Sequence, residues 1–186
     1  IIAIGASAGG PSALSKLLKE LPRDIPIPLA VVQHMPSEFI GGLARWLASS
    51  TGRTVMLAYD GMLLRPGVVH LSPGDAHLTI TRETHGLAAR LLYEQGPYRY
   101  QPSVDVLFET VASACGASAI GVVLTGMGDD GANGLLSMYR TGAVTFAQDK
   151  ASSTVFGMPN AAIERGAVRH VVSLAALPEA ILNLVN

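Results

Sequence analysis

The chain has 186 residues, of which 49% are hydrophobic and 15% charged, and its formal net charge is −1. This length and composition predict a single well-filled domain over residues 1–186 and exclude a disordered chain. The near-zero charge gives no electrostatic case for nucleic-acid binding, no apolar run is long enough for membrane insertion, and one cysteine excludes an internal disulfide.

The first feature is an apolar run at residues 1–4, followed by Gly5-Ala-Ser-Ala-Gly-Gly10. We interpret the run as a buried strand. The next segment has helical spacing, with Pro11 suited to its first turn and an apolar face at Leu14, Leu17, Leu18 and Leu21. Ser7 therefore lies on a strand-to-helix turn, beside free N–H groups of the helix.

This turn admits three interpretations. The spacing Gly5-x-Ser7-x-Gly9 fits a nucleophile elbow, in which glycines permit a sharp turn beneath an exposed serine. It also half-fits a dinucleotide-binding loop, but Ser7 replaces the central glycine, and His34 stands where a ribose-binding acid belongs. The third interpretation is a glycine-rich loop that only caps a helix.

The next strand, residues 29–33, ends at His34. One βαβ unit separates Ser7 from His34, so we expect both at the carboxyl ends of neighbouring parallel strands, where open α/β sheets bind ligands. A helix follows, with Ser37 as its predicted N-cap, and residues 53–59 form a third predicted strand.

The middle of the chain changes character. Short strands at residues 67–72, 77–81 and 87–92, separated by turn residues, predict a β-rich excursion with at least one antiparallel hairpin. A loop at residues 96–102 leads to a helix capped at Ser103. Cys115 ends the apolar stripe of that helix, which favours a core position over a nucleophile.

Alternation of strands and helices then resumes. We predict strands at residues 119–125, 143–147 and 167–172, and helices at 134–140, 160–165 and 174–185. Loops at residues 126–132 and 148–159 follow the first two of these strands. The predicted fold is three-layer α/β, with a doubly wound, mainly parallel sheet and an antiparallel hairpin excursion.

Ester hydrolysis near neutral pH needs a nucleophile, a base and a group that orients the base. Ser7, His34 and one acid of the pair Asp129 and Asp130 could supply them, because all follow predicted strands. The backbone N–H of Ala8 would be an oxyanion donor. A metal site using these aspartates and Asp149 has no spacing signature and leaves the serine unexplained.

Five stretches in order resemble the catalytic domain of bacterial chemotaxis protein-glutamate methylesterases, the CheB family. They are Gly5-Ala-Ser-Ala-Gly-Gly10, Gln33-His-Met-Pro36, Pro102-Ser-Val-Asp-Val-Leu-Phe108, Leu124-Thr-Gly-Met-Gly128 with Asp130-Gly-Ala132, and Ala147-Gln-Asp149 through Val155-Phe-Gly-Met-Pro159. The resemblance covers nearly the whole chain.

The resemblance implies a cytoplasmic serine hydrolase, without metal or cofactor, that cleaves γ-glutamyl methyl esters on the cytoplasmic helices of chemoreceptors. Many members also deamidate receptor glutamines. The family's triad falls on Ser7, His34 and Asp130, and its second oxyanion donor on the N–H of Met127. It also implies a regulatory receiver domain, which we expect to lie outside this chain, since Ile1 begins inside a strand.

The sequence departs from the family pattern at three places. Ala8 stands where threonine is more familiar, Asp129 stands where asparagine is usual, and residues 98–101 replace a basic stretch. These leave the chemistry intact and bear on the choice of receptor. The alternative function, from another class, is a non-catalytic domain that binds an anionic group at the helix N-terminus after Ser7.

Overall fold

Seven parallel strands form the central sheet in a computed structural model that describes residues 1–185. Their order across the sheet is β3-β4-β2-β1-β7-β8-β9: the chain first fills one side of β1, where β4 returns between β2 and the edge strand β3, and then the other side. The strands are β1 (Ile2–Ala6), β2 (Leu29–Gln33), β3 (Val55–Leu57), β4 (Val69–Leu71), β7 (Ile120–Val123), β8 (Val144–Gln148) and β9 (His170–Val172).

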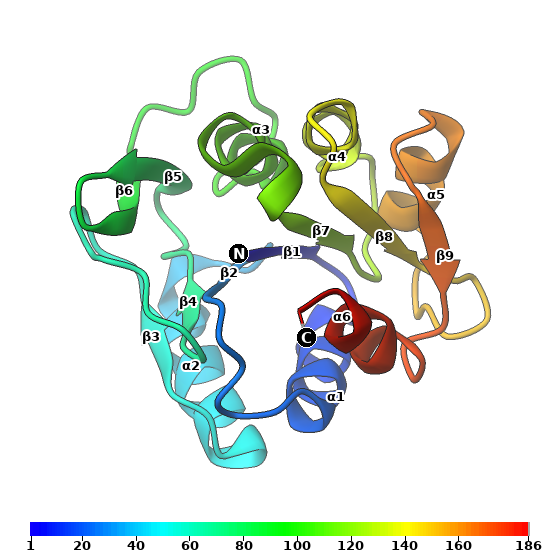
Figure 1. The fold of residues 1–186 in the computed structure, drawn as a ribbon, viewed down its shortest axis with the longest axis horizontal. Coiled ribbons are helices and arrows are strands. Elements are labelled where there is room, and N and C mark those ends of the chain that lie inside the picture. The colour runs from blue at the N-terminus through cyan, green and yellow to red at the C-terminus, as the bar shows by residue number, and fades with distance from the viewer. Residues whose placement is uncertain (186) are drawn as a thin grey trace.

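Helices cover both faces of the sheet, as Figure 1 shows: α1, α2 and α6 lie on one face, and α3, α4 and α5 on the other. Each face has its own buried apolar cluster, and β1 contributes to both because successive side chains of a strand point to opposite faces. The helices are α1 (Gly10–Glu20), α2 (Ser37–Thr51), α3 (Val104–Cys115), α4 (Ala132–Arg140), α5 (Gly157–Glu164) and α6 (Leu177–Val185), with a short 3₁₀ turn η1 (Gly116–Ser118) after α3.

A two-stranded antiparallel sheet, β5 (His77–Glu83) and β6 (Gly86–Leu92), stands apart from the main sheet. It packs against α3, where the Ile80 N–H donates to the Thr110 hydroxyl at 3.1 Å. Leu78, Ile80 and Ala89 are buried in the same cluster as α3. The predicted three-layer fold with a hairpin excursion is therefore confirmed, but the strand predicted at residues 67–72 is β4, which belongs to the main parallel sheet and not to the excursion.

Some predicted boundaries are wrong for local reasons. Ser37 is the first helical residue of α2 and not its N-cap, which is Pro36. Helix α5 begins at Gly157 rather than at residue 160, because the N–H groups of Gly157 and Met158 both donate to the Gly126 carbonyl. Ser103 does cap α3, with its hydroxyl accepting from Val106.

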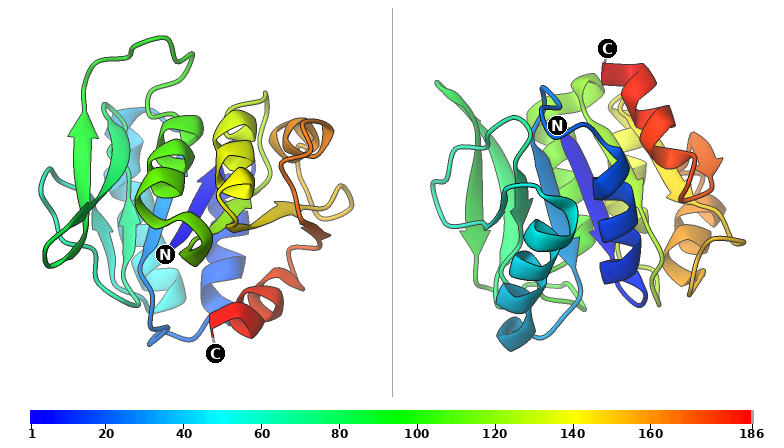
Figure 2. Two further views of the ribbon diagram at one scale, coloured as in Figure 1. Left: turned by 45° about the horizontal axis from the view of Figure 1, so that its top comes forward. Right: turned by 90° about the horizontal axis from the view of Figure 1, so that it is seen from below.

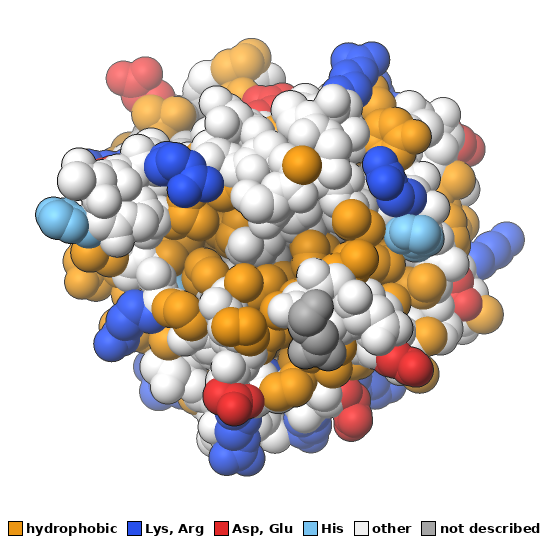
Figure 3. Space-filling view, viewed as in Figure 1, with side chains coloured by type: hydrophobic (Ala, Val, Ile, Leu, Met, Phe, Trp, Pro, Cys, Tyr) orange, Lys and Arg blue, Asp and Glu red, His pale blue; other side chains and the backbone are white. Residues whose placement is uncertain are grey.

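The two ends of the described chain lie together, at the end of the sheet where β1 begins (Figure 2). The side of the molecule that carries the two chain ends is shown in Figure 3. Hydrophobic side chains gather in a band across its middle, and most charged side chains lie around the periphery of the view. The carboxyl ends of the parallel strands lie at the opposite end of the molecule.

No helix in residues 1–185 is both long and apolar enough to span a membrane.

Candidate active site

Strand pairing places Ser7 and His34 side by side. Strands β1 and β2 pair in parallel with their last residues, Ala6 and Gln33, opposite each other, so Ser7 and His34 follow at the same edge of the sheet. The His34 N–H donates to the Ala6 carbonyl at 3.0 Å, and the Ser7 N–H donates to the Thr125 carbonyl at 3.1 Å. Ser7 therefore sits between the ends of β2 and β7, where the winding direction of the sheet changes.

The turn after Ser7 depends on its glycines. Gly9 adopts a φ of 79°, in the left-handed region that glycine enters without strain. A Cβ at Gly10 would overlap the side-chain oxygen of Gln33. Helix α1 can therefore start directly after Ser7, with Pro11 in its first turn as predicted.

Gln33 is a residue of this site that sequence reasoning left without a role. Its side chain is 1% exposed, and its Nε2 donates to the carbonyls of Ser7 and His34, both at 2.9 Å. The amide thus ties the serine turn to the histidine turn. A polar residue at the end of an apolar strand, directly before a candidate base, is the sequence signal that could have found it.

Asp130 is buried and fully hydrogen-bonded. His34 Nε2 lies 2.7 Å from its Oδ2, and the Ser103 hydroxyl donates to its Oδ1 at 2.8 Å. The N–H groups of Val104 and Asp105, in the first turn of α3, donate to the same carboxylate at 2.7 and 3.1 Å. A helix N-terminus therefore stabilises its negative charge.

Burial by itself would raise the pKa of Asp130. The hydrogen bonds from His34, Val104, Asp105 and Ser103 outweigh that effect and hold its pKa below the usual range. An ionised carboxylate only accepts hydrogen bonds, so the proton of the His34–Asp130 bond resides on Nε2. The neutral ring then has an unprotonated Nδ1. This is the reverse of the chymotrypsin arrangement, in which Nδ1 faces the acid.

The remaining predicted site atoms lie around this pair. Within residues 1–185, the Ser7 hydroxyl makes no hydrogen bond, to His34 or to any other group, and the backbone N–H groups of Ala8 and Met127 also have no acceptor. Both N–H groups are therefore free to bind an anion. The two loops that carry them are joined through Thr125, whose hydroxyl donates to the Ala8 carbonyl at 2.9 Å.

The competing predicted groups make no hydrogen bond to His34 within the described residues. Asp129 is exposed, whereas Asp130 is 6% exposed. The Asp149 carboxylate accepts from the N–H and hydroxyl of Ser152 in a local turn. The described part of the chain contains no cluster of three metal-ligating side chains. Cys115 packs against the core, and burial raises the pKa of its thiol, as expected for a residue that is not a nucleophile.

The loop before α3 contributes an aromatic ring that sequence reasoning did not place. Tyr100 stacks on His34, with ring centroids 4.6 Å apart and an angle of 16° between the planes. A hollow of about 310 Å³ opens beside this pair. Residues of the loops after β2 and β4 and of the loop before α3 line it: His34, Met35, Pro36, Gly74, Tyr100, Gln101 and Pro102.

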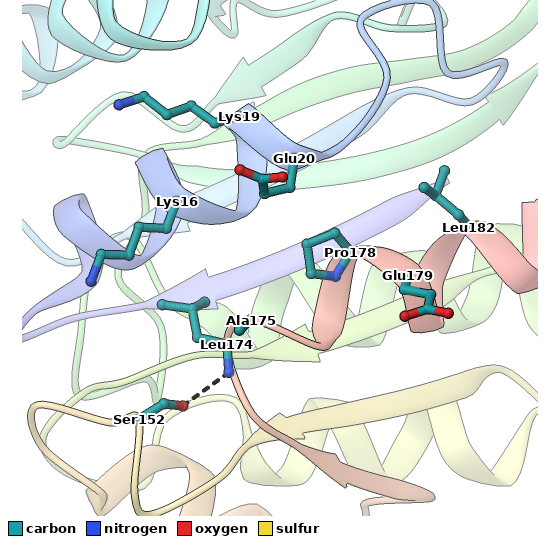
Figure 4. A pocket seen from close by; sticks show the side chains of 9 residues that line it. All are labelled: Lys16, Lys19, Glu20, Ser152, Leu174, Ala175, Pro178, Glu179 and Leu182. Atoms are coloured by element: carbon teal, nitrogen blue, oxygen red, sulfur yellow. Dashed lines mark hydrogen bonds between the residues drawn. The ribbon is translucent and has the colours of Figure 1, made fainter.

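A larger hollow, of about 760 Å³, lies between α1 and α6 (Figure 4). Figure 4 shows Ser152 there as an acceptor for the Leu174 N–H, a bond of 2.9 Å. No histidine or cysteine lines this hollow, and the hydroxyl of its serine, Ser152, is taken up by the Asp149 carboxylate and the Leu174 N–H. Its lining is Lys16, Lys19, Glu20, Ser152, Leu174, Ala175, Pro178, Glu179 and Leu182.

Comparisons with known proteins point to one family. A sequence model described as CheB methylesterase matches residues 2–181. The protein-glutamate methylesterase/protein-glutamine glutaminase 1 of Caulobacter vibrioides is 48% identical over 187 residues, which cover 100% of this chain and 54% of that protein. The protein-glutamate methylesterase/protein-glutamine glutaminase 3 of Myxococcus xanthus is 47% identical over 182 residues, which cover 98% of this chain and 50% of that protein.

A solved structure is similar over nearly its full length. The crystal structure of the Thermotoga maritima CheB methylesterase catalytic domain superposes with a TM-score of 0.95 at 36% identity. The similarity covers 99% of this chain and 97% of that one. The chain thus spans about half the length of the curated relatives that it matches, and nearly all of the solved catalytic domain.

Proposed function

The chain belongs to the CheB methylesterase family, and from that premise we propose that it is a serine hydrolase acting on γ-glutamyl methyl esters of chemoreceptor helices. The observation that carries the proposal is the His34–Asp130 hydrogen bond of 2.7 Å beside Ser7. A base with a fixed tautomer next to a serine, with backbone N–H donors nearby, suits acyl transfer.

In this mechanism, the Ser7 hydroxyl turns toward His34 Nδ1 when substrate binds and attacks the ester carbonyl. His34 accepts the serine proton, and Asp130 stabilises the imidazolium that forms. The N–H groups of Ala8 and Met127 donate to the oxyanion of the tetrahedral intermediate. His34 then protonates the departing methoxide, which leaves as methanol, and activates the water that hydrolyses the glutamyl ester of Ser7.

The same groups suit a glutamine side chain. Attack on the amide carbonyl passes through the same oxyanion, and the leaving group takes the proton of His34 and departs as ammonia. The relatives named above are called both methylesterases and glutaminases. We therefore include deamidation of receptor glutamines in the proposal.

Two further parts of the proposal concern the protein's setting. Cytoplasmic chemoreceptor helices as substrate imply a cytoplasmic enzyme that works in sensory adaptation. The chain matches about half of each curated relative, which supports a second unit in the complete protein. We propose that this unit is a receiver domain that regulates access to Ser7.

The test is methanol release from a methylated chemoreceptor by this chain. The wild-type protein is expected to release methanol and Ser7→Ala is expected to release none, while both retain the same unfolding temperature. A fluorophosphonate probe separates the alternative function: a hydrolase becomes labelled at Ser7, whereas an anion-binding domain stays unlabelled. An unlabelled, folded protein without methanol release would contradict the proposal.

A further inference from the structure

The ring of Tyr100 lies face to face with the ring of His34, with 4.6 Å between their centroids. We propose that Tyr100 is a positioning residue, whose ring holds the His34 imidazole so that Nε2 stays on Asp130 and Nδ1 faces the Ser7 side. The inference rests on the proposed function, because it assigns His34 the role of base.

The imidazole needs a second restraint. Its Nε2–Asp130 hydrogen bond is the one side-chain hydrogen bond that the ring makes within residues 1–185. Rotation about the Cβ–Cγ bond of a histidine is a broad torsion, and a half-turn would take Nε2 away from Asp130. A ring stacked on one face of the imidazole leaves less room for that rotation, since the turning edge would collide with it.

Tyr100 can act as a restraint because its own loop is anchored. The neighbouring Tyr98 donates its hydroxyl to Glu109 on α3 at 3.0 Å and packs edge-on against His77. His77 Nδ1 accepts the Ser103 N–H at 3.0 Å. The Ser103 hydroxyl in turn donates to Asp130, so the loop that carries Tyr100 and the acid that orients His34 share one anchor.

The same stacking keeps water from the histidine–aspartate pair. The side chains of His34 and Asp130 are 11% and 5% exposed, although they lie at an open edge of the sheet. Hydrogen bonds strengthen where water is excluded. Within the described residues the Tyr100 hydroxyl makes no hydrogen bond, which assigns the effect to the aromatic ring and not to the hydroxyl.

The experiment compares Tyr100→Phe, Tyr100→Ala and Tyr93→Ala. Tyr93 is a tyrosine of the same loop with an exposed side chain, so its variant is the matched control. Two quantities are measured: kcat and KM for a methylated receptor, and the 15N NMR signals of the His34 ring, which report the nitrogen that carries the proton. The NMR measurement needs no substrate.

In Tyr100→Ala, we expect kcat to fall by about 2- to 12-fold with KM nearly unchanged, the range that corresponds to the loss of one aromatic pair. The His34 ring should then show a mixture of tautomers, in place of the single Nε2–H form. Tyr100→Phe should restore both the wild-type kcat and the single tautomer, and Tyr93→Ala should match wild type in both.

Several results would overturn this role. A Tyr100→Ala protein with wild-type kcat, or with reduced kcat and an unchanged single tautomer, would show that the ring does not position His34. A Tyr100→Phe protein as impaired as Tyr100→Ala would assign the effect to the hydroxyl. If wild type released no methanol but the tautomer changed as expected, the proposed function alone would fail.

Discussion

His34 Nε2 lies 2.7 Å from Asp130 Oδ2, and this hydrogen bond joins the end of β2 to the loop after β7. The bond uses the distal ring nitrogen, and the nitrogen nearer the backbone, Nδ1, makes no hydrogen bond within residues 1–185. The geometry distinguishes two substitutions of His34 that sequence alone would treat as equivalent.

Glutamine and asparagine at position 34 should differ in stability. The Nε2 of a glutamine reaches the place of His34 Nε2 and can still donate to Asp130, whereas the shorter asparagine places its amide near Nδ1. Both variants should lose methylesterase activity. Urea unfolding should show His34→Gln close to wild type and His34→Asn less stable by about 1–3 kcal/mol, the cost of removing one hydrogen bond from a buried carboxylate. Equal stabilities would contradict the assignment of Nε2 to Asp130.

Asp130→Asn should lose both activity and stability. The amide nitrogen replaces one oxygen of a carboxylate that accepts four hydrogen bonds, and therefore meets donors where an acceptor is needed. We expect kcat to fall by about 10⁴, as in the serine-protease precedent, and stability by about 1–3 kcal/mol. The exposed neighbour provides the control: Asp129→Asn should stay within about threefold of wild-type kcat. A large loss in Asp129→Asn instead would mean that the wrong acid has been chosen.

The stability cost of Asp130→Asn should depend on pH. The folded pKa of Asp130 lies below its ordinary 3.8, so its contribution to stability is present above the unfolded pKa and is lost as pH falls through the folded pKa. The stability difference between wild type and Asp130→Asn should therefore be constant from pH 7 to pH 5 and shrink below about pH 4. Urea unfolding at several pH values measures it. A difference that persists unchanged at pH 3 would argue against an ionised Asp130.

Gly10→Ala should impair the site through Gln33. The new methyl group would overlap the Gln33 side-chain oxygen, and the displaced amide would release the carbonyls of Ser7 and His34. We expect a loss of about 1–3 kcal/mol in stability together with a fall in kcat. Gly42→Ala, in α2 with open space around its Cβ, should instead gain about 0.5–1 kcal/mol. Wild-type kcat in Gly10→Ala would show that Gln33 does not support the two turns.

Two buried histidines should make the fold sensitive to mild acid. Burial lowers the pKa of His70 and of His77 from 6.5. A base with a lowered folded pKa binds more protons when unfolded, so stability is full above pH 6.5 and decreases as pH falls toward the folded values. Unfolding free energies between pH 7.5 and 5 should show this slope. His70→Gln should flatten it, and His85→Gln, in the exposed turn of the hairpin, should not.

Much of this protein could be predicted from local sequence. Apolar runs of four or five residues, alternating with helical stripes, predicted the parallel sheet and its layers, because burial on both faces demands such runs. The glycines around Ser7 and the position of His34 after the next strand placed both residues at one sheet edge. Motif resemblance added the choice of Asp130 over Asp129.

Other features depend on contacts between segments that are distant in the chain, and only the tertiary structure decided them. The four donors to Asp130 come from the residue after β2 and from the N-cap and first turn of α3, and the Gln33 amide bonds two separate turns. Tyr100 meets His34 only because the loop before α3 folds back over the end of β2. Sequence periodicity reports which face of an element is buried, but hydrogen bonds and ring stacking depend on atomic positions that packing alone sets.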